Sequence, residues 1–348
     1  MPRDTPSDPE FAFEARVCRW AERRWPPAGD RDGAVVVARQ LGTRDRRWDT
    51  VVVEADPEGL AARARFGADE LDSDLLHVVR NAPEAWTWYR DALPDPGYPW
   101  RYVRAAVHRA AARDLVEKRR DGNRIQIRRV APYPDWVRRI VAVENKPDLT
   151  RSAARRLGEQ LAHDVDRALA DEVWVATAAT GRRIEPVLLE DLPVEAGVLV
   201  VDRDARDHEV LWHPASLRGD RGGEAGTDAP HRDATHGDAN DPDAERRLVL
   251  AERAYGRGWR SYLDSMRPDC RHFELTRRGA ALLPRCAAKE CHQTPAECGS
   301  SCGAFEPEPP AWRTRGWPIE GGPGRGIRRL LDRRREWVRE RECGPDGE

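Results

Sequence analysis

Long apolar segments are missing from this chain of 348 residues. No apolar run approaches the roughly 20 residues that a membrane-spanning helix needs, so we expect no membrane segment. The first ten residues, MPRDTPSDPE, are polar and lack the apolar core of a signal peptide. Together these two absences predict a cytoplasmic protein.

An excess of one charge is also missing. The formal net charge is −2 although 34% of the residues are charged, so the overall charge favours no class of partner. Lysine is scarce, because the chain has only Lys118, Lys146 and Lys289, and its other basic side chains are mainly arginine. A lysine at a given position is therefore unusual in this chain, where arginine is the common basic residue. Cysteine is present at seven positions, four of them close together near the C-terminus, which suits a metal site better than a disulfide framework.

Residues 140–146, IVAVENK, predict a short buried strand that ends in polar side chains. Side chains two apart in a strand point to the same face, so Glu144 and Lys146 should share one pocket. A carboxylate can hold a divalent cation, and a lysine can stabilise a phosphate or a nucleophilic water. This pair is what a metal-dependent site for phosphodiester cleavage needs. An acid at this spacing also arises by chance, so the interpretation depends on the neighbouring elements.

The elements before this strand supply further acidic residues. Residues 11–25 have the apolar spacing of a helix, with Glu14 near its start. Residues 34–41 and 48–54 predict two strands joined by a polar hairpin turn. Asp49 opens the second strand, where an acid is unfavourable for the strand itself. It is either a turn-capping residue or a second ligand for a cation held by Glu144.

The elements after it complete an α/β layer. Residues 150–170 predict a helix whose Gln160 and Asp164 lie four positions apart and so share one edge. The expected order of elements is typical of a mixed β-sheet flanked by helices. Further strands are expected at 172–177, 197–201 and 209–212.

The segment between Asp49 and Glu144 is too long to be a loop without structure of its own. Residues 71–93 and 100–115 predict helices, and a β-hairpin is expected around Asp121-Gly122. A basic helix followed by a basic hairpin is typical of a winged-helix module, although both elements could instead merely cover the sheet. In the winged-helix interpretation arginines contact DNA phosphates. The candidates are Arg109, Arg113, Arg119, Arg120 and Arg124.

The order of these polar groups along helix, strand, strand and helix resembles the restriction-endonuclease-like (PD-(D/E)XK) nuclease superfamily. The resemblance covers residues 11–213. It departs from the family pattern in three ways: Trp48 stands in place of a proline, the insertion is unusually long, and Asp164 replaces a tyrosine found in the exonuclease branch. The residues that carry the resemblance are Glu14, Asp49, Glu144, Asn145, Lys146 and Gln160.

The resemblance implies a role for each of these residues. Asp49 and Glu144, together with the Asn145 carbonyl, would bind Mg²⁺ or Mn²⁺, and Glu14 would assist the metal. Lys146 would position or deprotonate the attacking water, and Gln160 would orient the substrate. As single positions on helices, Glu14 and Gln160 would more commonly be solvated side chains.

The C-terminal third has a different composition. Residues 218–246 have almost no apolar side chains and predict a flexible linker. Residues 247–266 predict a helix, and residues 326–342 a charged one. Four close thiols within residues 247–310 predict a zinc site or an iron–sulfur cluster, and either Cys270 or His292 could replace one ligand. Cys18 could serve as a distant ligand, or the thiols could bind no metal. The four thiols are Cys286, Cys291, Cys298 and Cys302.

The sequence therefore predicts a nuclease-like core with two additions. The core is expected at 11–56 and 131–213, and the winged-helix-like module at 57–130. The predicted function is divalent-metal-dependent DNA hydrolysis in repair or defence. The alternative is a non-catalytic DNA-binding regulator that uses the inserted module. The remaining parts are a linker at 214–246, a cysteine-rich region at 247–310 and a basic tail at 311–348.

Overall fold

The computed structural model describes residues 10–29, 33–43, 46–179, 189–202, 205, 207–218, 242–259, 270, 272–278, 281–292, 298 and 302–306. Among the helices of these residues, none has the length and apolar character to span a membrane. The predicted basic tail, and most of the predicted linker, lie outside the described residues.

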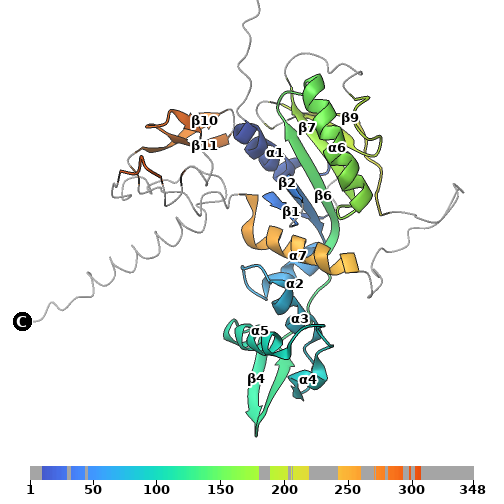
Figure 1. The fold of residues 1–348 in the computed structure, drawn as a ribbon, viewed down its shortest axis with the longest axis vertical. Helices are drawn as coiled ribbons and strands as arrows, with labels where there is room; N and C mark the ends of the chain where they lie inside the picture. Colours follow the sequence, from blue (N-terminus) through green and yellow to red (C-terminus); the bar gives the residue numbers. More distant parts are fainter. Residues whose placement is uncertain are drawn as a thin grey trace, which may run out of the picture.

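The centre of the protein is a six-stranded mixed sheet (Figure 1). Its first three strands in sheet order are antiparallel, the next two connections are parallel, and the last pairing is antiparallel. The prediction of a mixed sheet flanked by helices is therefore confirmed. In sheet order the strands are β1 (Ala34–Gly42), β2 (Arg47–Ala55), β6 (Val137–Lys146), β7 (Glu172–Ala178), β8 (Gly197–Val201) and β9 (His208–Trp212).

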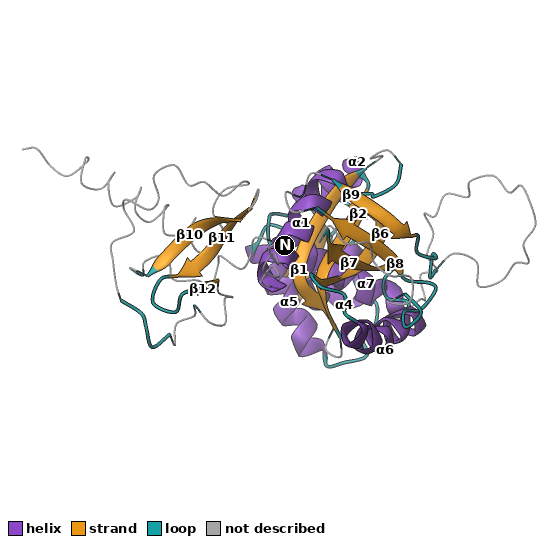
Figure 2. Cartoon of the chain, turned by 90° about the horizontal axis from the view of Figure 1, so that it is seen from above, coloured by secondary structure: helices purple, strands orange, loops and turns teal. Residues whose placement is uncertain are grey.

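Helices cover both faces of this sheet because the strands carry apolar residues on both sides. Helix α1 (Glu10–Arg24) buries Trp20 and neighbouring apolar side chains against one face. Helices α6 (Arg151–Arg167) and α7 (Pro242–Arg257) bury apolar side chains against the other face (Figures 1 and 2). Thr150 caps α6 by accepting a hydrogen bond from the backbone N–H of Ala153.

Helix α7 corrects the predicted boundaries. It begins at Pro242, inside the range expected to be a linker, and it packs on β1, β2 and β6. Leu250, Ala251 and Ala254 are buried in the same core as α6. Residues assigned from the sequence to a separate cysteine-rich region therefore belong to the layer that covers the central sheet.

The insertion between β2 and β6 forms a smaller α/β module with its own core. The single helix expected over 71–93 is wrong: α3 ends at Asn81, and Ala82 is extended because Pro83 follows it. The hairpin around Asp121-Gly122 is confirmed, and Gly122 has a positive φ at its turn. Its elements are α2 (Pro57–Ala64), α3 (Ser73–Asn81), β3 (Thr87–Trp88), α4 (Tyr89–Ala92), α5 (Trp100–Ala112), β4 (Val116–Asp121) and β5 (Arg124–Arg129), with strand order β3-β5-β4.

Several contacts attach the inserted module to the core, among them two hydrogen bonds and a buried ion pair. Where the chain leaves and re-enters the sheet, the backbone N–H of Asp56 donates to the carbonyl of Trp136 at 2.9 Å. Farther along, Arg63 of α2 forms a fully buried ion pair with Glu252 of α7. The Tyr133 hydroxyl also donates to Glu252, at 2.6 Å. The module is therefore held at its two ends and through α7.

A third, small sheet follows α7 in the chain. It contains β10 (Phe273–Arg278), β11 (Ala281–Cys286) and β12 (Cys291–His292), all antiparallel. The sequence pattern predicts no strands here. Phe273 and Cys270 are buried in the core that α1 shares with the central sheet, so α1 lies between the two sheets.

Candidate functional site

Four carboxylates gather where β2 and β6 lie beside α1 and α6. Asp49 of β2 accepts a hydrogen bond from the backbone N–H of Asn145 at 3.0 Å, which ties it to the end of β6. Glu144 precedes Asn145 on that strand and is buried. Glu14 reaches the group from α1 and Asp164 reaches it from α6, and both are buried. We call Glu14, Asp49, Glu144 and Asp164 the acidic cluster.

One amide joins two members of the acidic cluster. The Nε2 of Gln40 donates to Glu14 Oε1 at 2.6 Å and to Asp49 Oδ1 at 3.1 Å. Gln40 has a φ of 52°, a left-handed conformation that is uncommon for a residue with a side chain. It interrupts the regular pairing of β1 with β2 next to Asp49. Strained backbone of this kind is frequent at functional sites.

Two arginines partly neutralise the cluster. Arg39 of β1 donates to Glu14 at 2.9 Å. Arg46, in the turn before β2, donates to Glu144 at 2.7 Å and to both oxygens of Asp164 at 2.9 to 3.1 Å. The Arg46 guanidinium therefore lies between Glu144 of β6 and Asp164 of α6. A metal ion bound by these two carboxylates would have to occupy the same position.

The remaining negative charge raises the proton affinity of two members. Burial, with the nearby charge of Asp49, raises the pKa of Glu144 to about 8, and the charge of Arg46 opposes this only in part. Burial likewise raises the pKa of Glu14 to about 7, against the opposing charge of Arg39. Four carboxylates share two guanidinium groups, so the site favours protons or an added cation.

Asn145 and Lys146 complete the end of β6. The side-chain amide of Asn145 donates to Thr50 at 2.9 Å, while its Oδ1 is buried and has no hydrogen-bond partner among the described residues. Lys146 lies on the same strand face as Glu144, and its Nζ donates to Glu10 of α1 at 3.2 Å. Its side chain is partly exposed, so it can reach a molecule that approaches the cluster.

The donor set fits a hard divalent cation. Carboxylate and amide oxygens are the ligands that Mg²⁺ and Mn²⁺ prefer, and surplus buried carboxylates gain most from such an ion. Within the described part of the chain, no group of three or more histidine, cysteine or acidic side chains is already spaced to hold a metal. Binding at the acidic cluster would therefore require Arg46 to move from between Glu144 and Asp164.

The structure brings together most of the residues expected at this site. Glu14, Asp49, Glu144 and Lys146 meet at one end of β2 and β6, whereas Gln160 lies exposed on α6. The α6 side chain buried in the cluster is Asp164, one turn farther along. Sequence reasoning also missed Arg39, Gln40 and Arg46. The only signal for the first two was a polar pair inside an otherwise apolar strand.

A cavity of about 550 Å³ lies in the inserted module between α5, α4 and the β4–β5 hairpin. Among the described residues, its charged lining side chains are all basic. The Nζ of Lys118 lies 2.9 Å from Nδ1 of His108. Burial and the charges of Lys118 and Arg104 lower the pKa of His108, which favours its neutral form. We call this cavity the basic pocket, and its basic residues are Arg90, Arg104, His108, Lys118, Arg119 and Arg120.

The arginines predicted to contact DNA fall into three groups. Arg109 is paired with Asp72 and Asp74, and Arg113 donates to backbone carbonyls of residues 69 and 70, so both connect α5 to the start of α3. Arg119 and Arg120 line the basic pocket. Arg124 lies over the ring of Trp88, with 4.8 Å from its Cζ to the ring centroid.

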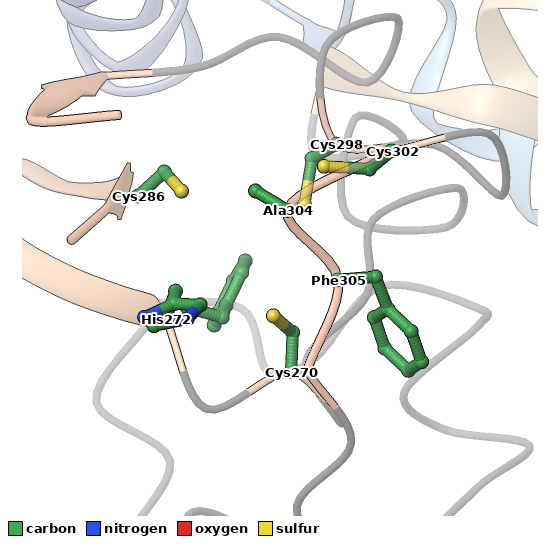
Figure 3. A pocket seen from close by; sticks show the side chains of 8 residues that line it. Cys270, His272, Cys286, Cys298, Cys302, Ala304 and Phe305 are labelled. Atoms are coloured by element: carbon green, nitrogen blue, oxygen red, sulfur yellow. The ribbon is translucent and has the colours of Figure 1, made fainter. Parts of the chain in front are cut away.

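Cysteines surround a second, small cavity beside β10 and β11 (Figure 3). The sequence predicted Cys291 as one of the four thiol ligands, but Cys291 is exposed and does not line this cavity. Cys270 lines the cavity instead. Cys18 is buried elsewhere, on α1, with its Sγ 3.3 Å from the Thr50 hydroxyl. We call this cavity the cysteine pocket, and its thiols are Cys270, Cys286, Cys298 and Cys302.

Comparison with known proteins gives one match. Residues 36–307 match the family described as "Family of unknown function (DUF5787)". The chain belongs to the DUF5787 family. No curated protein and no solved structure matches it.

The DUF5787 match spans the main features of this structure. It includes Asp49, Glu144 and Lys146 of the central sheet, the whole inserted module and the cysteine pocket. Helix α1, which carries Glu14, precedes the matched residues.

Proposed function

We propose that this DUF5787 protein is a divalent-metal-dependent nuclease that hydrolyses phosphodiester bonds in DNA. The observation that carries the proposal is the acidic cluster, in which four carboxylates, three of them buried, share only two guanidinium groups. A cluster that merely stabilised the fold would be expected to balance its charges, because an uncompensated buried carboxylate is costly.

The position of Lys146 supports a hydrolytic role rather than simple cation storage. It lies two residues after Glu144, on the same face of the strand, and its ammonium reaches the rim of the cluster. A compact ammonium there can orient a water and offset negative charge that grows on a phosphate. The order of acid, acid and lysine on successive strands also agrees with what the resemblance to the PD-(D/E)XK superfamily implies.

Each residue has a defined part in this proposal. Asp49 and Glu144 hold the cation, with Glu14 and Asp164 available from the flanking helices once Arg46 withdraws. A bound ion would supply a lower pKa for a nearby water and positive charge beside the phosphate oxygens. Lys146 orients the attacking water, whose oxygen bonds to phosphorus as the bond to the leaving sugar oxygen breaks. The water loses its proton to solvent and the leaving sugar oxygen takes up a proton, which gives a phosphate monoester and a sugar hydroxyl.

The inserted module would bind the nucleic acid. Its helices, followed by a hairpin to which β3 adds a third strand, agree with a winged-helix arrangement in which α5 and the hairpin face DNA. The basic pocket lies between these two elements, and Trp88 beside it offers an aromatic face. Another cavity, distinct from the basic pocket and the cysteine pocket, has a volume of about 570 Å³. It extends from Arg46 and Asp164 to Ser73 at the start of α3. This cavity borders the acidic cluster at Arg46 and Asp164, where a bound strand would meet it.

Cleavage assays on three substitutions test the catalytic part of the proposal. The purified protein is incubated with labelled single- and double-stranded DNA in Mg²⁺, Mn²⁺ or EDTA. Asp49→Ala should lose both metal binding and cleavage. Lys146→Ala should keep metal binding and lose cleavage by about 10²–10³-fold, which is typical when one electrostatic group is removed from an active site. Lys146→Arg should not restore it, because the larger planar group cannot replace a compact ammonium.

Gln160→Ala is the control for these variants, because Gln160 is exposed on the helix that carries Asp164. It should cleave as the parent does. Parent-like cleavage by both Lys146 variants would show that Lys146 and the end of β6 are not the active site. If the parent binds DNA but cleaves none with either metal, the chain is instead a DNA-binding regulator, which the basic pocket favours as the second candidate.

The DNA-binding role has its own matched pair of substitutions. Arg104→Ala with Arg120→Ala should weaken binding and reduce the slope of log affinity against log salt by about 0.9 for each phosphate that is no longer neutralised. Arg109→Ala should leave the slope unchanged, because Arg109 is already occupied by Asp72 and Asp74. Equal slopes for the two variants would exclude the basic pocket as the DNA-binding surface.

A further inference from the structure

The cysteine pocket combines thiols from separate parts of the C-terminal region. Cys270 precedes β10, Cys286 ends β11, and Cys298 and Cys302 come from the segment after β12. Figure 3 shows the Cys270 and Cys286 side chains directed toward the space beside Cys298 and Cys302. Three of the four are buried, and none of the four forms a disulfide. Four reduced thiols around one space are the ligand set of a structural zinc site.

The size and lining of the pocket indicate a single ion. Its volume is about 10 Å³, which is room for about one water-sized sphere. Phe273, Ala304 and Phe305 surround it with apolar groups, which limit access of water to the thiols. One tetrahedral ion with four thiolate ligands accounts for this lining without the several metal and sulfide atoms that an iron–sulfur cluster would add.

A positive side chain lies where a four-thiolate site would need one. Four thiolates around Zn²⁺ carry a net charge of −2. Lys289 forms a hydrogen bond to Cys302. Lys289 lies in the turn between β11 and β12, so its ammonium can offset part of that negative charge.

The described side chains of the small sheet contribute few apolar groups to the shared core. The sheet consists of two six-residue strands and one two-residue strand. In its described part, the buried apolar contribution to the shared core comes from Phe273 and from the cysteines themselves. Sheets this small rarely bury enough apolar area to be stable alone, and a structural metal is a common remedy.

We propose that the four thiols of the cysteine pocket bind one structural Zn²⁺ ion, with Cys270 as a ligand and Cys291 outside the site. Because no group of three or more described side chains already stands at metal-ligand spacing, binding has to draw the four sulfur atoms together, and it releases their protons. This site is separate from the acidic cluster, and it does not depend on nuclease activity.

The comparison of Cys270→Ser with Cys291→Ser tests the assignment. Full-length protein is prepared under reducing conditions without chelator, and its zinc and iron contents are measured by elemental analysis. The parent and Cys291→Ser should each contain one zinc per chain. Cys270→Ser should contain less than roughly a tenth of that amount, because one of four ligands is gone. Zinc in Cys270→Ser together with its loss from Cys291→Ser would overturn the assignment, as would iron with sulfide or no metal in the parent.

A second variant covers the case in which Cys270→Ser does not fold. Cys270→His keeps a ligand at the same position, so it should retain one metal ion. Replacement of zinc by Co²⁺ should give an absorption spectrum typical of four thiolates in the parent and in Cys291→Ser, and one typical of three thiolates and a histidine in Cys270→His. Identical cobalt spectra for the parent and Cys270→His would exclude Cys270 as a ligand.

Discussion

Two buried charge clusters in this protein contain similar residues but differ in charge balance. The pair of Arg63 and Glu252 has one guanidinium and one carboxylate, joined by two hydrogen bonds of 2.5 Å. Arg63 also donates to the carbonyls of residues 67 and 69, while Glu252 accepts from Tyr133 and from the backbone of Leu71. The acidic cluster instead has four carboxylates for two guanidinium groups, with a buried amide oxygen of Asn145 left without a partner among the described residues.

The difference separates a structural role from a binding role. A buried ion pair whose donors and acceptors are satisfied needs nothing more, and its removal should affect only the fold. A cluster with surplus buried carboxylates is destabilised until a proton or a cation joins it. The two clusters should therefore respond in opposite ways when a charged side chain is removed.

The largest effect is expected at the balanced cluster. Arg63→Met leaves Glu252 buried without its partner and should lower the free energy of unfolding by about 3–5 kcal/mol. The double variant Arg63→Met/Glu252→Leu should recover most of this loss, because no uncompensated charge remains. Chemical denaturation with urea measures both. Arg129→Met is the control, since Arg129 pairs with Glu84 at the surface, where such pairs contribute about 1 kcal/mol or less. Equal losses for Arg63→Met and Arg129→Met would contradict the comparison.

An effect of opposite sign is expected at the acidic cluster. Folding raises the pKa of Glu14 and Glu144 from 4.5 to about 7 and 8, so the folded state binds more protons than the unfolded state between these values. Without divalent metal, stability should fall as the pH rises from about 4.5 to 8, by about 1.4 kcal/mol for each unit by which folding raises a pKa. Glu144→Gln should flatten this slope and should not destabilise the metal-free protein at pH 8.

Denaturation curves collected in EDTA across this pH range measure how the stability of the parent and of Glu144→Gln changes with pH. Glu84→Gln is the control, because Glu84 is highly exposed and should leave the slope as it is. Addition of Mg²⁺ should reduce the slope in the parent but not in Glu144→Gln. A parent whose stability rises steadily over the same pH range would show that the acidic cluster carries no surplus charge.

Local patterns in the sequence were enough to place much of the core. The alternation and the two-residue spacing of IVAVENK placed Glu144 and Lys146 on one strand face, and the order of elements placed Asp49 beside them. The partners of these acids could not be predicted in the same way. Arg46 lies in a polar turn, and its contact with Asp164 joins residues that are 118 positions apart.

Helical periodicity predicts which edge of a helix faces the site, but it does not predict which turn along that edge does. Gln160 and Asp164 share an edge of α6, and only the packing of that helix on the sheet decides which turn faces Glu144. The cysteine pocket shows the same limit, because closeness in sequence favoured Cys291. The pairing of β10 with β11 instead brings Cys270 beside Cys286, since Phe273 and Cys286 are partners in that ladder. Chain distance is a poor guide wherever a strand reverses direction.

The way the inserted module is attached has a consequence for how the chain folds. Ala55 and Val137 are neighbours on paired strands, yet residues 56–136 separate them along the chain. The entropy lost in closing a flexible loop grows with its length, so an unfolded insertion would slow the pairing of β2 with β6. A module that folds first brings its own two ends together, and the strands then meet as though a short turn joined them. The order of these two events should therefore set the rate at which Asp49 and Glu144 come together.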